Sequence, residues 1–170
     1  YNQSVMPILD ARAVEFFSRS PEQTRRVGMR LGALLQCGDV VCLSGELGSG
    51  KTTLVQGLAR GWGSPDAVSS PTFILVNAYR RPDGEVLHHL DSYRMISAWE
   101  AEDLDLDLML ERGPLVVEWP ERIAPALPEG RLWINLRWMA DSQRGMVINA
   151  QGQRYDDLLL QFRHSIFGGA

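Results

Sequence analysis

One eight-residue segment constrains the fold of this chain more than any other feature of the sequence. Residues 45–52 read Gly-Glu-Leu-Gly-Ser-Gly-Lys-Thr, which matches the phosphate-loop pattern Gly-x-x-x-x-Gly-Lys-Ser/Thr at every fixed position. The apolar run before it predicts a short buried strand over 39–43, and the apolar positions after it predict a helix over 52–60. A chance match is expected about once in a hundred chains of this size, given the usual frequency of glycine. We therefore interpret the segment as a phosphate loop rather than an ordinary glycine-rich turn.

The chemistry of this loop predicts a nucleoside triphosphate and magnesium as ligands. Glycines let successive backbone N–H groups point at phosphate oxygens, and the following helix N-terminus adds partial positive charge. Lys51 brings a mobile charge to the β and γ phosphates, and the Thr52 hydroxyl can ligate Mg²⁺. The residues expected to line the nucleotide site are Glu46, Leu47, Gly48, Ser49, Gly50, Lys51, Thr52 and Thr53.

Length and composition limit the remaining possibilities. With 170 residues, 45% of them hydrophobic and 22% charged, the chain suits one soluble α/β domain. We expect one domain over 1–170, with an N-terminal segment at 1–19 and a C-terminal helix over 155–170. No apolar run approaches the length of a membrane span, and the first residues lack the features of a signal peptide. The expected location is therefore cytoplasmic, without membrane contact.

Charge and cysteine content argue against two further classes of protein. A net charge of −4 and a pI near 5.4 disfavour a body that binds nucleic acid through bulk phosphate neutralisation. If RNA is involved, contact with it is expected to be indirect. Cys37 and Cys42 have no partner at metal-binding spacing, so we interpret both as buried free thiols.

Turn and capping patterns predict the other elements. A capping box at 20–23 predicts a helix that ends near Gly38, and a second box at 97–100 predicts a helical stretch towards Leu110. Further segments are predicted as a hairpin over 72–79 and 85–90, a buried strand over 114–118, a hairpin over 132–138 and 146–150, and a helix over 155–167. The predicted fold is a three-layer P-loop α/β domain, whose mixed, mostly parallel sheet is flanked by helices.

Two carboxylates stand at the ends of predicted strands. Asp91 ends the second strand of the first hairpin, and Glu118 ends the strand over 114–118. Because ligands of open α/β sheets bind at the carboxyl ends of strands, both are candidates for the magnesium site. The structural alternatives are that Asp91 caps the following turn and that Glu118 pairs with another side chain. His88 and His89 alternate across the strand, so at most one faces the site.

Short motifs narrow the class of nucleotide-binding protein. The chain contains neither the Asn-Lys-x-Asp guanine reader nor the Asp-x-x-Gly switch of GTPases. A small-molecule kinase would need an acceptor pocket and usually a lid with arginines, whereas the arginine-containing loops here are short. From these residues alone, the chain is an ATPase or an unspecified phosphotransferase.

Three further segments carry a resemblance to a known family. They are Ser-Pro-Thr-Phe at 70–73, His-Leu-Asp-Ser-Tyr-Arg at 89–94 and Glu-Trp-Pro-Glu at 118–121. In this order after the phosphate loop, they resemble the bacterial TsaE (YjeE) family, the ATPase required to make threonylcarbamoyladenosine in tRNA. The resemblance spans about residues 20–150. Glu46, Ser49 and Ser92 replace residues common in the family, which leaves the phosphate and metal groups intact.

The resemblance implies a role for each matched position. It implies that the 45–52 loop binds ATP or ADP and that Thr52 and Glu118 hold Mg²⁺. It places Asp91 on a magnesium-bound water or on the attacking water, so that Lys51, Asp91 and Glu118 form the catalytic set. It also implies a switch role for 70–73 and nucleotide contacts for Thr24 and Arg144.

The resemblance further implies partners. These are the TsaB and TsaD proteins, of which TsaD modifies adenosine 37 of tRNA, so that turnover is slow alone and stimulated in the complex. The competing hypotheses are a small-molecule kinase and a nucleotide-gated binding module. Whether Trp119, Tyr93 and Arg94 serve the nucleotide, a partner or packing stays open.

Overall fold

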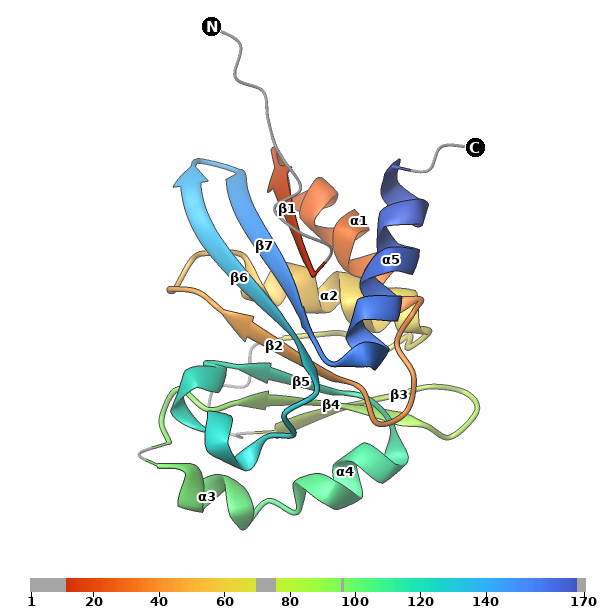
Figure 1. Cartoon of the computed structure of the whole chain (residues 1–170), viewed down its shortest axis with the longest axis vertical. Coiled ribbons are helices and arrows are strands. Elements are labelled where there is room, and N and C mark those ends of the chain that lie inside the picture. The colour runs from red at the N-terminus through yellow and green to blue at the C-terminus, as the bar shows by residue number, and fades with distance from the viewer. Residues whose placement is uncertain (1–11, 70–75, 96, 168–170) are drawn as a thin grey trace, which may run out of the picture.

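The computed structural model describes residues 12–69, 76–95 and 97–167 as a seven-stranded sheet with helices (Figure 1). Its helices are α1 (Pro21–Gly32), α2 (Lys51–Trp62), α3 (Ala98–Glu102), α4 (Leu106–Arg112), η1 (Pro120–Arg122), η2 (Ala124–Ala126) and α5 (Gln153–Phe167). Its strands are β1 (Ala13–Ser18), β2 (Val40–Ser44), β3 (Val76–Arg80), β4 (Val86–Asp91), β5 (Leu115–Glu118), β6 (Arg131–Ala140) and β7 (Gln143–Gln151). No helix in these residues is long and apolar enough to cross a membrane.

The sheet is parallel at its centre and antiparallel at both edges. Its strand order is β1-β7-β6-β2-β5-β4-β3. β6, β2, β5 and β4 pair in parallel, whereas β7 with β1 on one side and β3 on the other add antiparallel neighbours. The mixed sheet is confirmed, but the mostly parallel pairing that we expected is limited to these central strands.

Alternating side chains of the central strands build a hydrophobic core on each face of the sheet. In β2, Val41 and Leu43 pack with α1, α2 and α5, while Val40 and Cys42 pack on the opposite face with residues of α3 and α4. Figure 1 shows these two groups of helices on either side of the sheet. The period of two explains the pattern, because a continuous apolar run is buried on both faces of a central strand.

Glycines bring α1 and α2 into close contact. A Cβ at Gly28 would lie 2.5 Å from the Leu54 carbonyl oxygen, and one at Gly57 would lie 2.2 Å from the Arg25 carbonyl oxygen. Real Cβ atoms do not approach backbone so closely, so both positions require glycine. This contact fixes the helix that follows the phosphate loop.

Several local predictions need correction. β1 lies in the segment that we had left without structure, where it pairs with β7 at the edge of the sheet. Ser20 caps α1 as expected, but the Gln23 side chain accepts from the Arg19 N–H rather than from the cap residue. Ser97 makes no side-chain cap bond. Edge pairing and exact cap partners depend on tertiary contacts that a sequence pattern does not contain. The first predicted helix ends at Gly32 rather than near Gly38, and the helical stretch predicted towards Leu110 consists of two short helices, α3 and α4. Within the described residues, the other predicted helices and strands are confirmed with small shifts of their ends.

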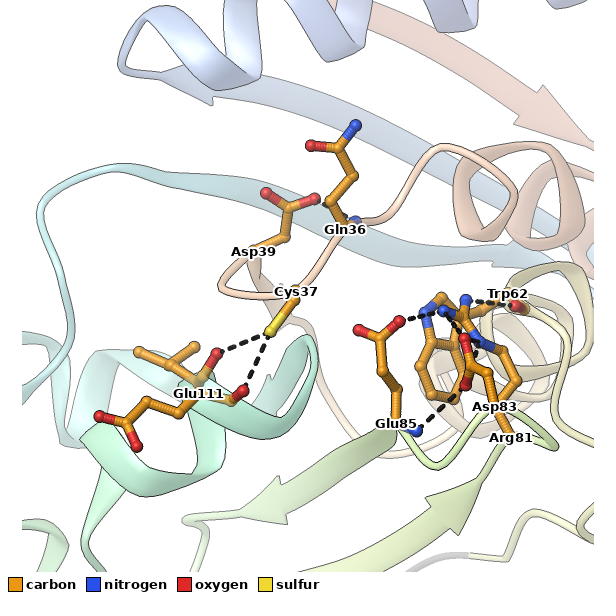
Figure 2. Close-up of polar contacts among 9 residues, drawn as sticks. Gln36, Cys37, Asp39, Trp62, Arg81, Asp83, Glu85 and Glu111 are labelled. Atoms are coloured by element: carbon orange, nitrogen blue, oxygen red, sulfur yellow. Dashed lines mark hydrogen bonds and ion pairs between the residues drawn. The ribbon is translucent and has the colours of Figure 1, made fainter.

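The amino-terminal ends of the central strands lie together at one end of the sheet (Figure 2). We name this end, which is distinct from the outer strands β1 and β3, the amino edge. Arg81 precedes β4 there, bonding Asp83 and Glu85 and lying 4.4 Å from the centroid of the Trp62 ring. Cys37 is exposed, contrary to our prediction of a buried thiol, and it donates to the Leu110 carbonyl at 3.2 Å. Partial burial, followed by the charge of Glu85, raises the pKa of this thiol.

Cys42 follows the prediction, since it is a buried free thiol. Burial raises its pKa to about 12. A thiol with a raised pKa carries little thiolate and is therefore unreactive. Neither cysteine is a candidate for chemistry.

Candidate functional site

The opposite end of the central strands, which we name the carboxyl edge, carries the glycine loop. Gly45, Gly48 and Gly50 have φ values of +154°, +83° and +103°, which L-residues rarely adopt. At Gly45 a Cβ would also lie 2.5 Å from the Leu136 carbonyl oxygen. The loop then enters α2 directly, with Lys51 as its first helical residue. Both the backbone conformation and the close packing therefore require glycine in this tight turn at the end of the sheet.

A cleft of about 610 Å³ opens at this edge. Its size is within the range of small-molecule sites. Most of the predicted site residues meet in it, together with three that we had left open. Its lining is Glu46, Leu47, Gly48, Ser49, Gly50, Lys51, Thr52, Thr53, Asp91, Tyr93, Arg94, Glu118, Trp119 and Arg144.

Thr24 is the predicted site residue that lies outside this cleft. It is 1% exposed, and its hydroxyl is 2.7 Å from the Ser18 hydroxyl. It lines a small adjoining cavity of about 40 Å³, together with Arg144 and Thr53. The structure thus gives Thr24 a structural hydrogen bond between α1 and β1. The segment 70–73, which we predicted as a switch, lies outside the described residues.

Lys51 is held inside the cleft by the backbone. Its ammonium donates to the Gly45 carbonyl and, at 3.3 Å, to the Glu46 carbonyl. It also lies 4.3 Å from the centroid of the Trp119 ring, within cation–π range. Burial lowers its pKa, and the nearby Glu118 carboxylate partly opposes that shift. The carbonyl groups of the loop therefore hold the desolvated Lys51 ammonium inside the cleft.

The two strand-end carboxylates are neighbours across the sheet. Asp91 of β4 and Glu118 of β5 are direct register partners, and Glu118 is in turn opposite Leu43 of β2, which leads into the loop. Asp91 Oδ1 accepts from the Tyr93 N–H at 2.9 Å. Burial is the main cause that raises the pKa of Asp91. Asp91 therefore caps the next turn, as the structural alternative held, and lines the cleft as well.

Glu118 is nearly fully buried at 4% exposure. One of its oxygens, Oε2, is 2.5 Å from Nε2 of His89, which is itself fully buried. His88 is on the opposite face of β4, and its ring is half-buried. Between the two histidines, His89 is thus the one that contacts a cleft residue.

Sequence reasoning gave no firm role to the aromatic side of the cleft. Trp119 has φ of +58°, which is uncommon for a bulky residue, and its ring packs on Tyr93 with centroids 4.9 Å apart. The buried Ser92 hydroxyl donates to the carbonyls of Glu118 and Trp119 at 2.8 and 2.7 Å. This hydroxyl stabilises the unusual turn. The serine at 92 was a visible signal, but its partners follow only from the register of β4 on β5.

Unpaired buried atoms indicate which ligand the cleft suits. Five side-chain atoms of the described residues are buried without a hydrogen-bond partner, and two of them, Ser49 Oγ and Arg144 Nε, belong to residues that line the cleft. Buried polar atoms are normally paired, and a donor pair beside a glycine loop and a buried ammonium fits a phosphate group.

The donor set also fits magnesium. No group of three or more His, Cys, Asp or Glu side chains in the described residues is arranged to hold a metal alone. Mg²⁺ is usually bound through one or two carboxylates together with substrate phosphates, so such a group is not required. The Thr52 hydroxyl, Asp91 and Glu118 provide oxygen ligands of the kind that Mg²⁺ prefers.

Comparisons with known proteins agree with one another. Residues 18–146 match the family model described as threonylcarbamoyl adenosine biosynthesis protein TsaE. A tRNA threonylcarbamoyladenosine biosynthesis protein TsaE from Streptomyces coelicolor is 43% identical over 137 residues, which cover 77% of this chain and 93% of that protein. The Bacillus subtilis protein of the same name is 40% identical over 141 residues, covering 82% and 87%. The crystal structure of Bacillus subtilis YdiB superposes with a TM-score of 0.75 at 31% identity, covering 91% of this chain and 97% of that one.

Proposed function

This chain belongs to the TsaE family, and from this premise we propose that it is a magnesium-dependent ATPase that supports the synthesis of threonylcarbamoyladenosine in tRNA. The observation that carries the proposal is the convergence of four groups in one cleft. These groups are the glycine loop, the buried Lys51 ammonium and the strand-end carboxylates Asp91 and Glu118. The same constellation of loop, cation and strand-end acids is the one that phosphoryl transfer needs.

The loop binds the phosphates of ATP in this proposal. Its N–H groups, the N-terminus of α2 and the Ser49 hydroxyl surround the β phosphate. Lys51 exchanges its bonds to the Gly45 and Glu46 carbonyls for phosphate oxygens. The exchange is favourable because a desolvated ammonium gains more from an anion than from a neutral carbonyl.

The carboxylates hold the metal and orient water. Thr52 and Glu118 would ligate Mg²⁺, and Asp91 would bind a metal-bound water or the attacking water. When bound, Mg²⁺ neutralises charge that develops on the phosphate oxygens. The pKa of Asp91 is raised by burial, which suits a residue that accepts a hydrogen bond from water.

Adenine rather than guanine is proposed because the chain lacks the guanine reader and because of family membership. Turnover is proposed to be slow in the free protein and faster in a complex with TsaB and TsaD. In that complex the ATPase acts on the assembly, and contact with tRNA is indirect. The acidic pI of about 5.4 supports this division, since it disfavours direct RNA binding.

The direct test is ATP hydrolysis by the purified protein, alone and with TsaB and TsaD from the same organism, in the presence and absence of Mg²⁺. We expect strong stimulation by the partners. ADP formation that depends on a small-molecule acceptor instead would identify a kinase, which transfers the phosphoryl group to that acceptor rather than to water.

The Glu118→Ala variant separates catalysis from gating. Loss of both turnover and tRNA modification would support an ATPase. Modification that survives the loss of turnover would show that nucleotide binding alone is needed, as in a nucleotide-gated module.

A further inference from the structure

A chain of buried hydrogen bonds connects β3, β4 and β5 behind the cleft. The Tyr79 hydroxyl is 2.9 Å from Nδ1 of His89, and Nε2 of His89 is 2.5 Å from Oε2 of Glu118. These three residues are 3%, 0% and 4% exposed. The chain thus runs from the outer strand of the sheet to the carboxylate in the cleft without contact with bulk solvent.

The pattern of donors and acceptors defines how the chain is connected. Glu118 as a carboxylate only accepts, so Nε2 of His89 must carry the proton between them. In a neutral imidazole, Nδ1 is then an acceptor, which receives the Tyr79 hydroxyl proton. That hydroxyl is 2.9 Å from Nδ1 and 3.3 Å from the Ser69 carbonyl, and the shorter distance favours the bond to His89. The acceptor Glu118 on one side and the Tyr79 hydroxyl on the other are thus compatible with one tautomer of His89, which presents its Nε2–H to Glu118.

The rest of the cleft does not restrain this carboxylate in the same way. The Lys51 ammonium bonds backbone carbonyls, and Ser92 bonds the backbone carbonyls at 118 and 119 rather than the Glu118 side chain. A glutamate has three side-chain torsions, so a fixed main chain alone does not fix its carboxylate. The bond from His89 supplies the missing restraint.

We propose that His89 is a positioning residue, which anchors Oε2 of Glu118 so that the other oxygen is presented to the cleft, while the Tyr79 hydroxyl bonds the second ring nitrogen of His89. This inference rests on the proposed function, because it assigns Glu118 to the metal. Hydrogen-bond partners that orient a ligating carboxylate typically change metal affinity or activity by 10- to 100-fold when removed. The phosphate loop is a separate element, so nucleotide affinity without metal is expected to be unaffected.

The test compares His89→Ala with His89→Gln, whose side-chain amide carries an N–H donor in place of Nε2. Calorimetry with ADP, in EDTA and in MgCl₂, gives the gain in nucleotide affinity that Mg²⁺ provides. A titration of ATP turnover with Mg²⁺ gives the half-maximal metal concentration. We expect His89→Ala to raise that concentration by about 10- to 100-fold and to lose most of the Mg²⁺-dependent gain, with ADP affinity in EDTA unchanged. His89→Gln should recover part of both.

His88→Ala is the matched control, because its neighbouring ring is half-buried on the other face of β4. It should leave the metal dependence as in wild type. Tyr79→Phe removes only the distal hydroxyl and should shift the metal requirement in the same direction as His89→Ala, by a smaller factor. This variant, with His89→Gln, decides the matter if His89→Ala does not fold.

Three results would overturn the inference. The first is a wild-type metal dependence in His89→Ala. The second is an equal loss of the Mg²⁺-dependent gain in His89→Gln and His89→Ala, with a lowered melting temperature as the only other change in both variants. The third is an effect of His88→Ala on metal dependence that equals the effect of His89→Ala. The proposed function fails separately, if the wild-type protein shows neither nucleotide binding nor turnover with Mg²⁺.

Discussion

Buried charged side chains have different hydrogen-bond partners at the two ends of the same parallel strands. At the amino edge, the Asp39 carboxylate is 4% exposed and accepts two hydrogen bonds from Arg154, at 2.9 and 2.7 Å. At the carboxyl edge, Lys51 and Glu118 are about equally buried, at 6% and 4%. There, however, the ammonium bonds backbone carbonyls and the carboxylate bonds a histidine.

The charges of Asp39 and Arg154 at the amino edge are satisfied by the protein itself. Asp39 also accepts from the Gln36 N–H at 2.7 Å, and the Tyr155 hydroxyl accepts from the Val40 N–H at 2.8 Å. Hydrogen bonding to Asp39 is the main cause that raises the pKa of Arg154. Asp39 and Arg154 each have an opposite charge in contact, which is how buried ions are stabilised in a fold.

The buried charges of the carboxyl edge are not paired with each other in the same way. Its cation is desolvated, so that the pKa of Lys51 is lowered, and the neighbouring Ser49 hydroxyl and Arg144 Nε have no partner in the described residues. Charged and polar groups arranged in this way are typical of a functional site. From this comparison we propose that buried charge supports stability at the amino edge and ligand binding at the carboxyl edge.

The largest expected effect comes from the cation of the carboxyl edge. Lys51→Ala removes charge-assisted bonds to phosphate, each worth about 1.5–3 kcal/mol, so hydrolysis should fall at least about 100-fold and ATP binding should weaken. The unfolding free energy should stay near the wild-type value, since no carboxylate of the described residues is in salt-bridge contact with the ammonium. Turnover assays and urea unfolding measure the two quantities.

Arg154→Ala is the counterpart at the amino edge and should show the reverse pattern, with stability lowered and ATP affinity retained. Equal loss of turnover in both variants would contradict the distinction between the edges.

The next effect concerns the buried carboxylate of the amino edge. Asp39→Ala leaves the Arg154 guanidinium and the Gln36 N–H without their acceptor, which should cost about 2 kcal/mol of unfolding free energy. Arg154 is partly exposed, so water replaces some of the lost contact and keeps the cost below that of a fully buried pair. Denaturant unfolding checks the value, and a variant as stable as wild type would show that the ion pair does not hold this edge.

A smaller loss of unfolding free energy is expected when the Tyr155 hydroxyl is removed. Tyr155→Phe leaves the buried Val40 N–H without an acceptor, at a cost of about 1 kcal/mol. ATP affinity should not change, because the hydroxyl lies at the far end of β2. Parallel unfolding and calorimetric titrations would detect any coupling between the edges, which this account does not expect.

The smallest expected change in unfolding free energy is a gain in stability, in the Asp91→Asn variant. Burial raises the pKa of Asp91 above its usual value of 3.8, so the folded state holds this proton more tightly than the unfolded chain. The stability of the wild-type protein therefore falls as pH rises from that value through the raised pKa. Asp91→Asn keeps the acceptor for the Tyr93 N–H but cannot ionise. It should be more stable than wild type above this window and no more stable below it, while ATP turnover is lost.

Unfolding of Asp91→Asn and wild type between pH 3 and pH 7 tests this sign. A stability difference that does not depend on pH would mean that Asp91 titrates alike in both states.

The sequence predicted the carboxyl edge well because its chemistry depends on local spacing. The loop is contiguous from Gly45 to Thr52, and Asp91 and Glu118 each end an apolar run that is visible as a strand. Parallel strands then bring those ends together, as their register shows.

Features that depend on register or edge pairing could not be predicted. The contact of His89 with Glu118 requires knowing which face of β4 meets β5. β1 gains its structure by pairing with β7, and the contact between the Thr24 and Ser18 hydroxyls depends on that pairing. Cys37 follows α1 in a loop, whereas Cys42 lies in a strand. The residue type alone predicted that both thiols are buried, and this was wrong for Cys37.

The most direct test of the central claim is calorimetric titration of ATP into the wild-type protein and into Lys51→Ala and Arg154→Ala, each with Mg²⁺. The account predicts one ATP site in the wild-type protein, retention of that site in Arg154→Ala and loss of most of the affinity in Lys51→Ala. Equal ATP affinity in wild type and Lys51→Ala, or no ATP binding to the wild-type protein, would contradict the assignment of the carboxyl edge to a nucleotide.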